Sequence, residues 1–131
     1  MISELSIKTT KQTELIDITQ EINNVVKKAE IKEGQCHIFI PHTTAAVTIN
    51  ENADPSVKED ILKEINKIIP FEDNYSHTEG NAAAHIKSSL VGVNKTLLIK
   101  DGCLLLGTWQ GIYFCEFDGP RTRKIYVRIS P

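Results

Sequence analysis

The sequence of 131 residues lacks the features of membrane-spanning and disulfide-stabilised proteins. Its amino terminus has no basic region followed by an apolar stretch, and no apolar run approaches the roughly 18 to 20 residues that cross a bilayer. The cysteines, Cys36, Cys103 and Cys115, are odd in number and form no C-x-x-C pair. We therefore expect a cytoplasmic protein without membrane contact, whose cysteines are reduced core thiols.

A strong charge of one sign is also missing. The 15 lysines and arginines are balanced by 17 acidic residues, which gives a formal net charge of -2. Without a global basic field, the chain lacks the usual electrostatic attraction to nucleic acid, and we expect no nucleic acid partner. There is no internal repeat, low-complexity tract or linker, so the chain is expected to form one domain over residues 1–131.

Capping signals followed by apolar residues at helical spacing predict two or three helices. Asp17 precedes the first, Asp54 with Pro55 starts the second, and Asn81 starts a short third. The predicted helices run from Ile18 to before Gly34, from Pro55 to Pro70, and from Asn81 to Leu90. The stripe expected to be buried consists of Val57, Ile61, Ile65, Ile68 and Ile69 in the second helix, and of Ala83, Ile86 and Leu90 in the third.

Most of the remaining chain has the alternating pattern and residue types of strands. The predicted strands cover residues 3–8, 13–16, 35–40, 45–50, 96–100, 103–106, 109–117 and 124–129. The first two are expected to form an opening hairpin, and Asp101-Gly102 predicts another. The apolar run Leu104–Leu106 before Trp109 suggests burial between layers or against another subunit. Together these elements predict an α+β fold of mainly antiparallel, sandwich-like sheets covered by helices.

Three of the four histidines lie at junctions between predicted elements. His42 falls between two strands, and His77 and His85 enclose a turn that Gly80 makes feasible. If they converge, three imidazoles could hold a divalent transition metal, with zinc favoured over magnesium, and leave one position for water or substrate. Each histidine taken singly is also explained by a structural role, which is the role we assign to His37 in its strand.

Two glutamates lie close in sequence to these histidines. Glu79 precedes Gly80, and Glu51 ends the strand that begins near His42. Either could orient a histidine, bind metal or act as a general base. Isolated glutamates are more often solvated surface groups, so this role depends on their position next to the histidines.

The turn over residues 116–123 brings acidic and guanidinium groups together. Arg121 and Arg123 could recognise phosphate or carboxylate, and Lys87 adds a further cation. Free amides around Asn81 at a helix start could bind an anion as well. An ordinary β-turn with a surface ion pair explains the same residues equally well.

Taken together, these segments resemble the YjbQ family, small proteins known as secondary thiamine-phosphate synthase enzymes. The resemblance runs in order along nearly the whole chain. It is carried by Pro41–Ala45, Asn50–Ala53, Tyr75–His77, Glu79–Asn81, Ala84–Lys87, Leu106–Gln110 and Glu116–Arg121.

The resemblance implies an α+β homotrimer whose polar clefts lie between subunits. It also implies a thiamine-phosphate synthase activity, which joins a pyrimidine diphosphate to a thiazole phosphate with loss of pyrophosphate. Because the candidate site is rich in histidine, a metal-dependent hydrolase of a small phosphorylated metabolite and a non-catalytic metal or metabolite-binding protein remain alternatives. The candidate catalytic residues are His77, Glu79, His85 and Glu51; Asn81, Arg121 and Lys87 are candidates for substrate binding, and His42, His77 and His85 for metal.

Overall fold

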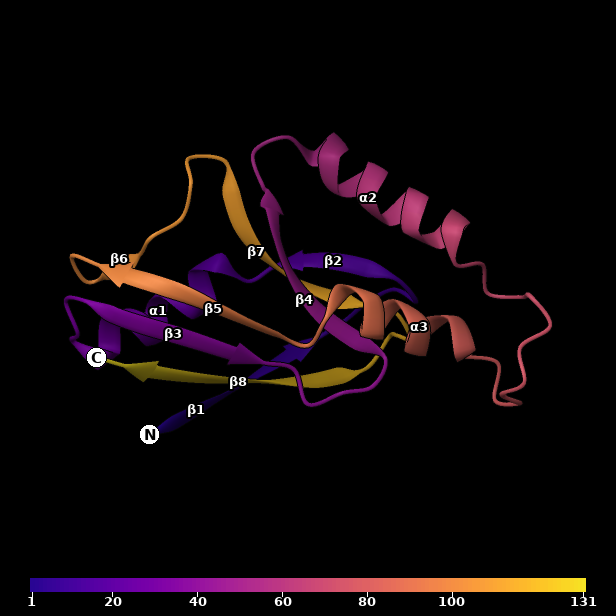
Figure 1. The fold of residues 1–131 in the computed structure, drawn as a ribbon, viewed down its shortest axis with the longest axis horizontal. Coiled ribbons are helices and arrows are strands. Elements are labelled where there is room, and N and C mark those ends of the chain that lie inside the picture. The colour runs from indigo at the N-terminus through magenta and orange to yellow at the C-terminus, as the bar shows by residue number, and fades with distance from the viewer.

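The computed structural model describes all 131 residues and contains two antiparallel sheets and three helices (Figure 1). One sheet has five strands in the order β1-β8-β3-β5-β6, and the other has three in the order β2-β7-β4. The strands are β1 (Ile2–Lys8), β2 (Glu14–Asp17), β3 (Gly34–Phe39), β4 (Ala45–Glu51), β5 (Asn94–Lys100), β6 (Cys103–Leu104), β7 (Gln110–Glu116) and β8 (Thr122–Ser130). The helices are α1 (Thr19–Ala29), α2 (Pro55–Ile68) and α3 (Ala82–Val91). The predicted α+β fold class and mainly antiparallel sheets are confirmed.

The three-stranded sheet is the middle layer of the molecule, and its strands alternate between two cores. Val47 of β4 and Phe114 of β7 belong to the main core, which lies between the two sheets and includes α1. Ala46 and Cys115, one position along each strand, belong to a smaller core with Ala84 of α3. Successive residues are therefore buried on opposite faces, which explains the continuous apolar runs of these strands.

Small residues bring α3 close to the middle sheet. Ala83 and Ala84 are fully buried, and the Ser88 hydroxyl donates to the Ala45 carbonyl at 2.6 Å. The predicted inward positions Ile86 and Leu90 are wrong, because Leu90 is 69% exposed and Ile86 is also exposed. The alanine face packs against β4 more closely than the larger residues could, and this sets the rotation of α3 that directs His85.

The start of α2 follows the prediction, but its burial does not. The Asp54 side chain accepts from the Ser56 backbone N–H at 2.9 Å, and Pro55 takes the first helical position. No residue within α2 is fully buried, but Ile61 and Ile65 are partly buried and pack against the smaller core, and Ile69 just after the helix is buried. Ile68 is 68% exposed, so the predicted stripe is wrong at this position. In the run predicted to be buried, Leu104 and Leu106 pack against the main core, whereas Leu105 is exposed in the single chain. Trp109 is 62% exposed.

The opening hairpin is a second error of the sequence prediction. β1 pairs with β8 in one sheet, while β2 pairs with β7 in the other. The Thr9 N–H donates to the Arg121 carbonyl at 2.9 Å, which continues the β1–β8 pairing as the chain leaves the five-stranded sheet. In contrast, the predicted Asp101-Gly102 turn joins β5 and β6, with φ values of 53° and 78°.

The cysteines are free, as expected, but they do not all lie in the core. Cys36 and Cys115 are buried, whereas Cys103 is exposed. Burial raises the pKa of the Cys36 thiol to about 11 and that of Cys115 to about 12. None of the three helices combines the length and the apolar character needed to cross a membrane.

Candidate functional site

A cleft of about 670 Å³ lies between the loop that follows β3 and the second half of α3. Pro41 ends β3, and Gly92, with a φ of 98°, ends α3. The Ile40 N–H donates to the Val93 carbonyl at 2.7 Å, which joins the two sides of the cleft at its base. The cleft is lined by Phe39, Ile40, Pro41, His42, Thr43, His85, Ser88, Ser89, Gly92 and Val93.

His85 connects this cleft to a second hollow that contains His77. The second hollow, of about 320 Å³, is lined by both histidines and by Tyr75. The rings of His77 and His85 meet edge to face, with centroids 5.3 Å apart. Gly80 has a φ of 82°, a conformation that glycine adopts without steric cost, and the turn it allows brings the two histidines together.

Glu79 lies beside the histidine pair. Its Oε2 atom is 3.8 Å from Nε2 of His77, and both side chains are largely exposed. At this distance the carboxylate can orient or stabilise a protonated His77, but solvent weakens the interaction. Glu79 therefore lies beside His77, and its catalytic role stays a prediction.

His42 lies at the other end of the cleft, and its ring is held by the main chain of β8. Its Nε2 atom accepts a hydrogen bond from the Lys124 backbone N–H at 2.9 Å. Burial lowers the pKa of His42, and the positive charges of Arg123 and Arg121 lower it further. These effects favour the neutral imidazole near pH 7.

Behind His42 lies a buried ion pair between Glu116 and Arg123, which are 0% and 3% exposed. Arg123 donates to both carboxylate oxygens of Glu116, and its Nη2 atom also donates to the Thr44 hydroxyl at 2.8 Å. The carboxylate accepts further bonds from the Thr9 hydroxyl at 2.8 Å and the Asp118 N–H at 3.0 Å. Burial raises the pKa of Glu116, but these donors outweigh it and hold that pKa below its usual value.

The sequence-based prediction for Arg123 was only a possible anion contact. It did not include the buried pair between Arg123 and Glu116. A usable signal was present, because Arg123 stands two residues before Ile125 and four before Val127. In a strand these positions share one face, and Ile125 and Val127 are buried core residues. An arginine on the buried face of a strand requires a buried acidic partner.

Arg121 and Asn81 are joined through Asp118. The Arg121 Nη2 atom lies 3.2 Å from Oδ2 of Asp118, and its Nε atom donates to the Asp118 carbonyl at 2.9 Å. The Asn81 side chain donates to the same carboxylate at 2.9 Å, while its Oδ1 atom is buried without a partner. Arg121 is half exposed, so its guanidinium remains accessible to an anion.

Two predicted site residues lie away from the cleft. Glu51 lies at the far end of β4 (Figure 1), six residues or about 20 Å from Ala45, and pairs with Gln110. Lys87 is fully buried: its Nζ atom donates to Oδ1 of Asn66 at 2.6 Å and lies 4.3 Å from the Phe71 ring centre. Burial lowers the pKa of Lys87. Neither side chain lines the cleft.

The three predicted metal ligands do not form a single cluster in one chain. No group of three or more His, Cys, Asp or Glu side chains is close enough together to hold one metal ion. His77 and His85 are adjacent, but the Nε2 lone pair of His42 is used by Lys124. His37, predicted as structural, lies 3.2 Å from the Thr96 hydroxyl through its Nδ1 atom.

The fold and the cleft define a small α+β sandwich protein with a histidine-lined site. Residues 3–131 match the family model described as UPF0047 protein YjbQ-like, and the chain belongs to this family. It is 56% identical over 129 residues to the UPF0047 protein MJ1081 of Methanocaldococcus jannaschii, covering 98% of this chain and 94% of that protein. It is 52% identical over 130 residues to the UPF0047 protein YugU of Bacillus subtilis, covering 98% of each chain.

Solved structures agree with this assignment. A crystal structure of an uncharacterized YjbQ/UPF0047 family protein from Clostridium acetobutylicum superposes with a TM-score of 0.96 at 50% identity, covering 98% of this chain and 99% of that one. A protein of unknown function from Sulfolobus solfataricus superposes with a TM-score of 0.94 at 36% identity, covering 98% of this chain and 95% of that one. These names assign no activity to the relatives.

Proposed function

We propose that this protein is an enzyme that acts on a small phosphorylated, thiamine-related substrate in the cleft between His42 and His85. The proposed reaction joins a pyrimidine diphosphate to a thiazole phosphate and releases pyrophosphate. The observation that supports it is the position of His85, which lines the cleft and also contacts His77. A proton can thus pass between the substrate and a second titratable ring.

The cleft combines surfaces that suit a heteroaromatic phosphate. Phe39, Pro41 and Val93 provide apolar walls for a ring, and the volume of about 670 Å³ lies in the range of small-molecule sites. Arg121 is half exposed, and its positive charge lowers the pKa of His42. It can therefore attract a phosphate group toward the His42 end of the cleft. Polar and apolar parts of one substrate could therefore be bound side by side.

The proposed chemistry needs the developing pyrophosphate to be stabilised. The carbon–oxygen bond at the pyrimidine methylene breaks, the thiazole nitrogen bonds to that carbon, and pyrophosphate leaves with the bond electrons. A protonated His85 can donate a proton to the leaving oxygen, and His77 with Glu79 can return one to His85. Arg121 contributes positive charge where the leaving group becomes more negative.

A steady-state assay with both precursors tests this proposal. We expect His85→Ala and His77→Ala each to lower kcat/KM by about 10²-fold or more, as for loss of a general acid or base. His37→Ala is the matched control, because that histidine is half-buried in β3 and does not line the cleft. Equal product formation by the wild type and His77→Ala would reject the synthase mechanism.

The adjacent rings of His77 and His85 also support a second candidate, a metal-dependent hydrolase or a metal-binding protein. Two imidazoles favour zinc or another transition metal over magnesium. Elemental analysis of the purified protein, with His85→Ala as control, tests for the ion. Phosphate release from generic esters would then support hydrolysis, whereas stoichiometric binding without turnover would support a binding protein.

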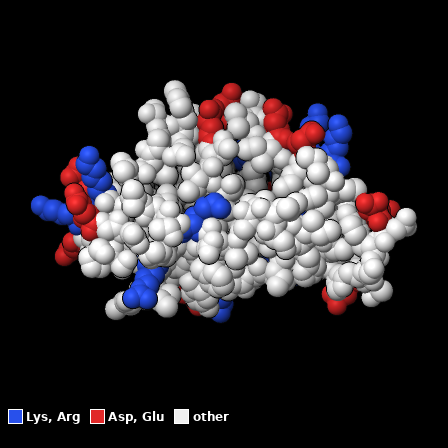
Figure 2. Space-filling view, viewed as in Figure 1, with Lys and Arg blue, Asp and Glu red and all other residues white.

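We further propose that three copies assemble in the cytoplasm into a homotrimer. The outward side chains Phe39 and Leu98 are exposed apolar groups, and in Figure 2 most charged groups lie around the rim of the face, with one basic group near its centre. The exposed Trp109, Ile68 and Leu90 offer further apolar contact area. Light scattering should give three times the chain mass of 14.7 kDa; a mass of one chain would reject the trimer.

A further inference from the structure

We infer that His42 is a neutral hydrogen-bond donor, through Nδ1, to an anionic oxygen of the substrate, and that it is neither a metal ligand through Nε2 nor a general base. The donor role rests on the proposed function, because it needs a substrate in the cleft. The assignment of the two ring nitrogens does not, because it depends only on the fold.

The hydrogen bond from Lys124 decides which ring nitrogen carries the proton. A backbone N–H is always a donor, so the nitrogen 2.9 Å away from it, Nε2 of His42, must be unprotonated. A neutral imidazole has one N–H, which is then on Nδ1. Metal binding and proton abstraction both require a nitrogen lone pair, and the Nε2 lone pair is already used.

The strand pairing explains why this bond forms. The ladder between β3 and β8 ends at the pair Phe39 and Tyr126. Two residues before Tyr126 in β8, the Lys124 N–H donates to the His42 ring instead of a strand carbonyl, because Pro41 turns the chain away from β8. The imidazole thus takes the place of a missing backbone acceptor.

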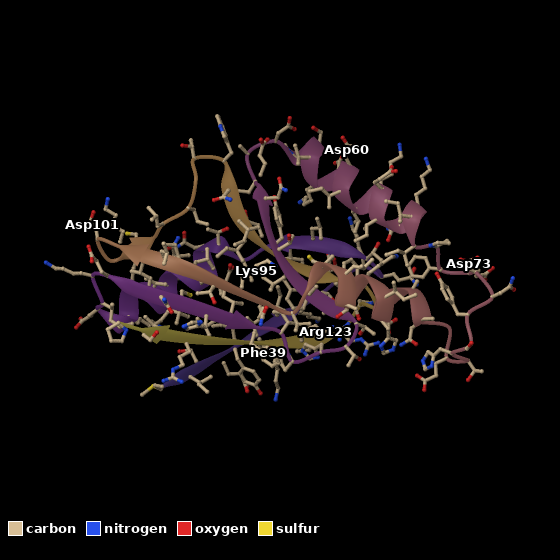
Figure 3. All side chains as sticks on the ribbon, viewed as in Figure 1. Phe39, Asp60, Asp73, Lys95, Asp101 and Arg123 are labelled. Carbon is tan, nitrogen blue, oxygen red and sulfur yellow. The ribbon has the colours of Figure 1, made fainter.

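The buried ion pair holds both sides of this bond. Arg123 directly precedes Lys124, and its guanidinium donates to the Thr44 carbonyl and hydroxyl, two residues after His42. Figure 3 places Arg123 near the middle of the molecule, beside the loop that joins β3 to β4. Turning the His42 ring to free Nε2 would remove the protein acceptor of the Lys124 N–H, while the bonds from Arg123 to Thr44 hold the two backbone segments together.

The chemistry of the ligand follows from what remains on the cleft side. His42 offers an uncharged N–H, and Arg121 nearby is half exposed and positively charged. Both groups donate hydrogen bonds and neither accepts. An oxygen anion such as a phosphate oxygen meets this requirement, whereas a ligand cation does not.

Nitrogen-15 NMR of the histidine side chains in the full-length protein tests the assignment near neutral pH. We expect a protonated Nδ1 and an unprotonated Nε2 for His42, and we expect inorganic phosphate to shift the Nδ1 signal. Zinc should leave the Nε2 signal in place. A protonated Nε2, or a zinc-dependent shift of Nε2 with loss of the Lys124 contact, would overturn the inference.

Two variants separate the ring nitrogens in function. The amide nitrogen of asparagine lies near the place of Nδ1, and that of glutamine near the place of Nε2. With thermal unfolding as a check on folding, His42→Asn should bind inorganic phosphate at least about tenfold more tightly than His42→Gln, the effect of one retained hydrogen bond. Equal binding by the two variants would overturn the donor role.

The results also separate this inference from the proposed function. If the wild type makes no thiamine phosphate but phosphate still shifts the Nδ1 signal, the synthase proposal fails and the donor assignment stands. If product forms but Nε2 carries the proton, the synthase proposal stands and the donor assignment fails.

Discussion

The two loops that carry the histidines differ in how firmly they are held. In the loop after β3, His42 is bound by the Lys124 main chain, and Thr44 by the buried Arg123. Before α3, His77 contacts the edge of the His85 ring and an exposed Glu79 at 3.8 Å. In the proposed function, the loop after β3 presents a fixed hydrogen-bond donor, and the loop before α3 carries the residues that exchange protons.

The physical basis of this difference is solvation. The Glu116–Arg123 pair is out of contact with water, and its carboxylate is fully bonded, so each partner depends strongly on the other. The His77–Glu79 pair is screened by water and contributes little to stability. Four substitutions can break or sharpen the comparison.

The largest expected effect comes from Arg123→Leu, which leaves the Glu116 carboxylate buried without its cation. We expect the free energy of unfolding to fall by about 3–5 kcal/mol, measured by urea denaturation. The exposed Arg128→Leu in the same strand is the matched control and should change stability by no more than about 0.5 kcal/mol. Similar losses in both variants would show that the buried pair does not hold this region.

Arg121→Ala should affect activity more than stability. Its pair with Asp118 is partly exposed, so the unfolding free energy should change by no more than about 1 kcal/mol. Loss of a charged hydrogen bond to phosphate should lower kcat/KM by about 10- to 100-fold. Unchanged kcat/KM in a folded variant would remove Arg121 from the proposed substrate site.

Lys87→Met tests the buried lysine through the pH dependence of stability. Because burial lowers the pKa of Lys87 in the folded state, the unfolded chain binds the proton more tightly. The buried charge on Lys87 therefore destabilises the wild type at low pH. This cost falls as pH increases toward the ordinary pKa of 10.5, so the free energy of unfolding rises. Urea denaturation should show that the free energy of unfolding of the variant, minus that of the wild type, is larger at about pH 7 than at about pH 10. The opposite trend would contradict the lowered pKa of Lys87.

The smallest effect is expected from His42→Asn under acid conditions. The pKa of His42 is lowered in the folded state, so its contribution to stability is complete above the ordinary value of 6.5 and is lost as pH falls through the folded pKa. The stability of the wild type relative to the variant should decrease between about pH 7 and about pH 5. An increase over this range would mean that the folded protein favours the charged ring.

Local chemistry made much of the fold predictable. Asp54 with Pro55 favours a helix start through contacts within a few residues, and Asp101-Gly102 favours a tight turn in the same local way. Gly92 ends α3 for the same kind of reason. In each case the interacting groups lie within a few residues of one another, so the local sequence is enough to predict the structure.

The errors arise where distant residues decide the outcome. The hairpin prediction failed because Thr9 bonds to Glu116 and Arg121, more than 100 residues away. Glu51 was expected in the site because it follows His42 in sequence, but the length of β4 separates them. Ile86 was expected inward by size, whereas close packing of the alanines against β4 turned it outward.

The sequence by itself determined the helices and most strands, the histidines at their junctions, and the turn at Gly80 that brings His77 to His85. Only the tertiary structure decided that Lys87 is buried, that Glu116 pairs with Arg123, and that His42 receives a bond from a residue 82 positions later. The reason is that spacing controls geometry within a helix or turn, while strand pairing joins segments whose separation the local sequence does not specify.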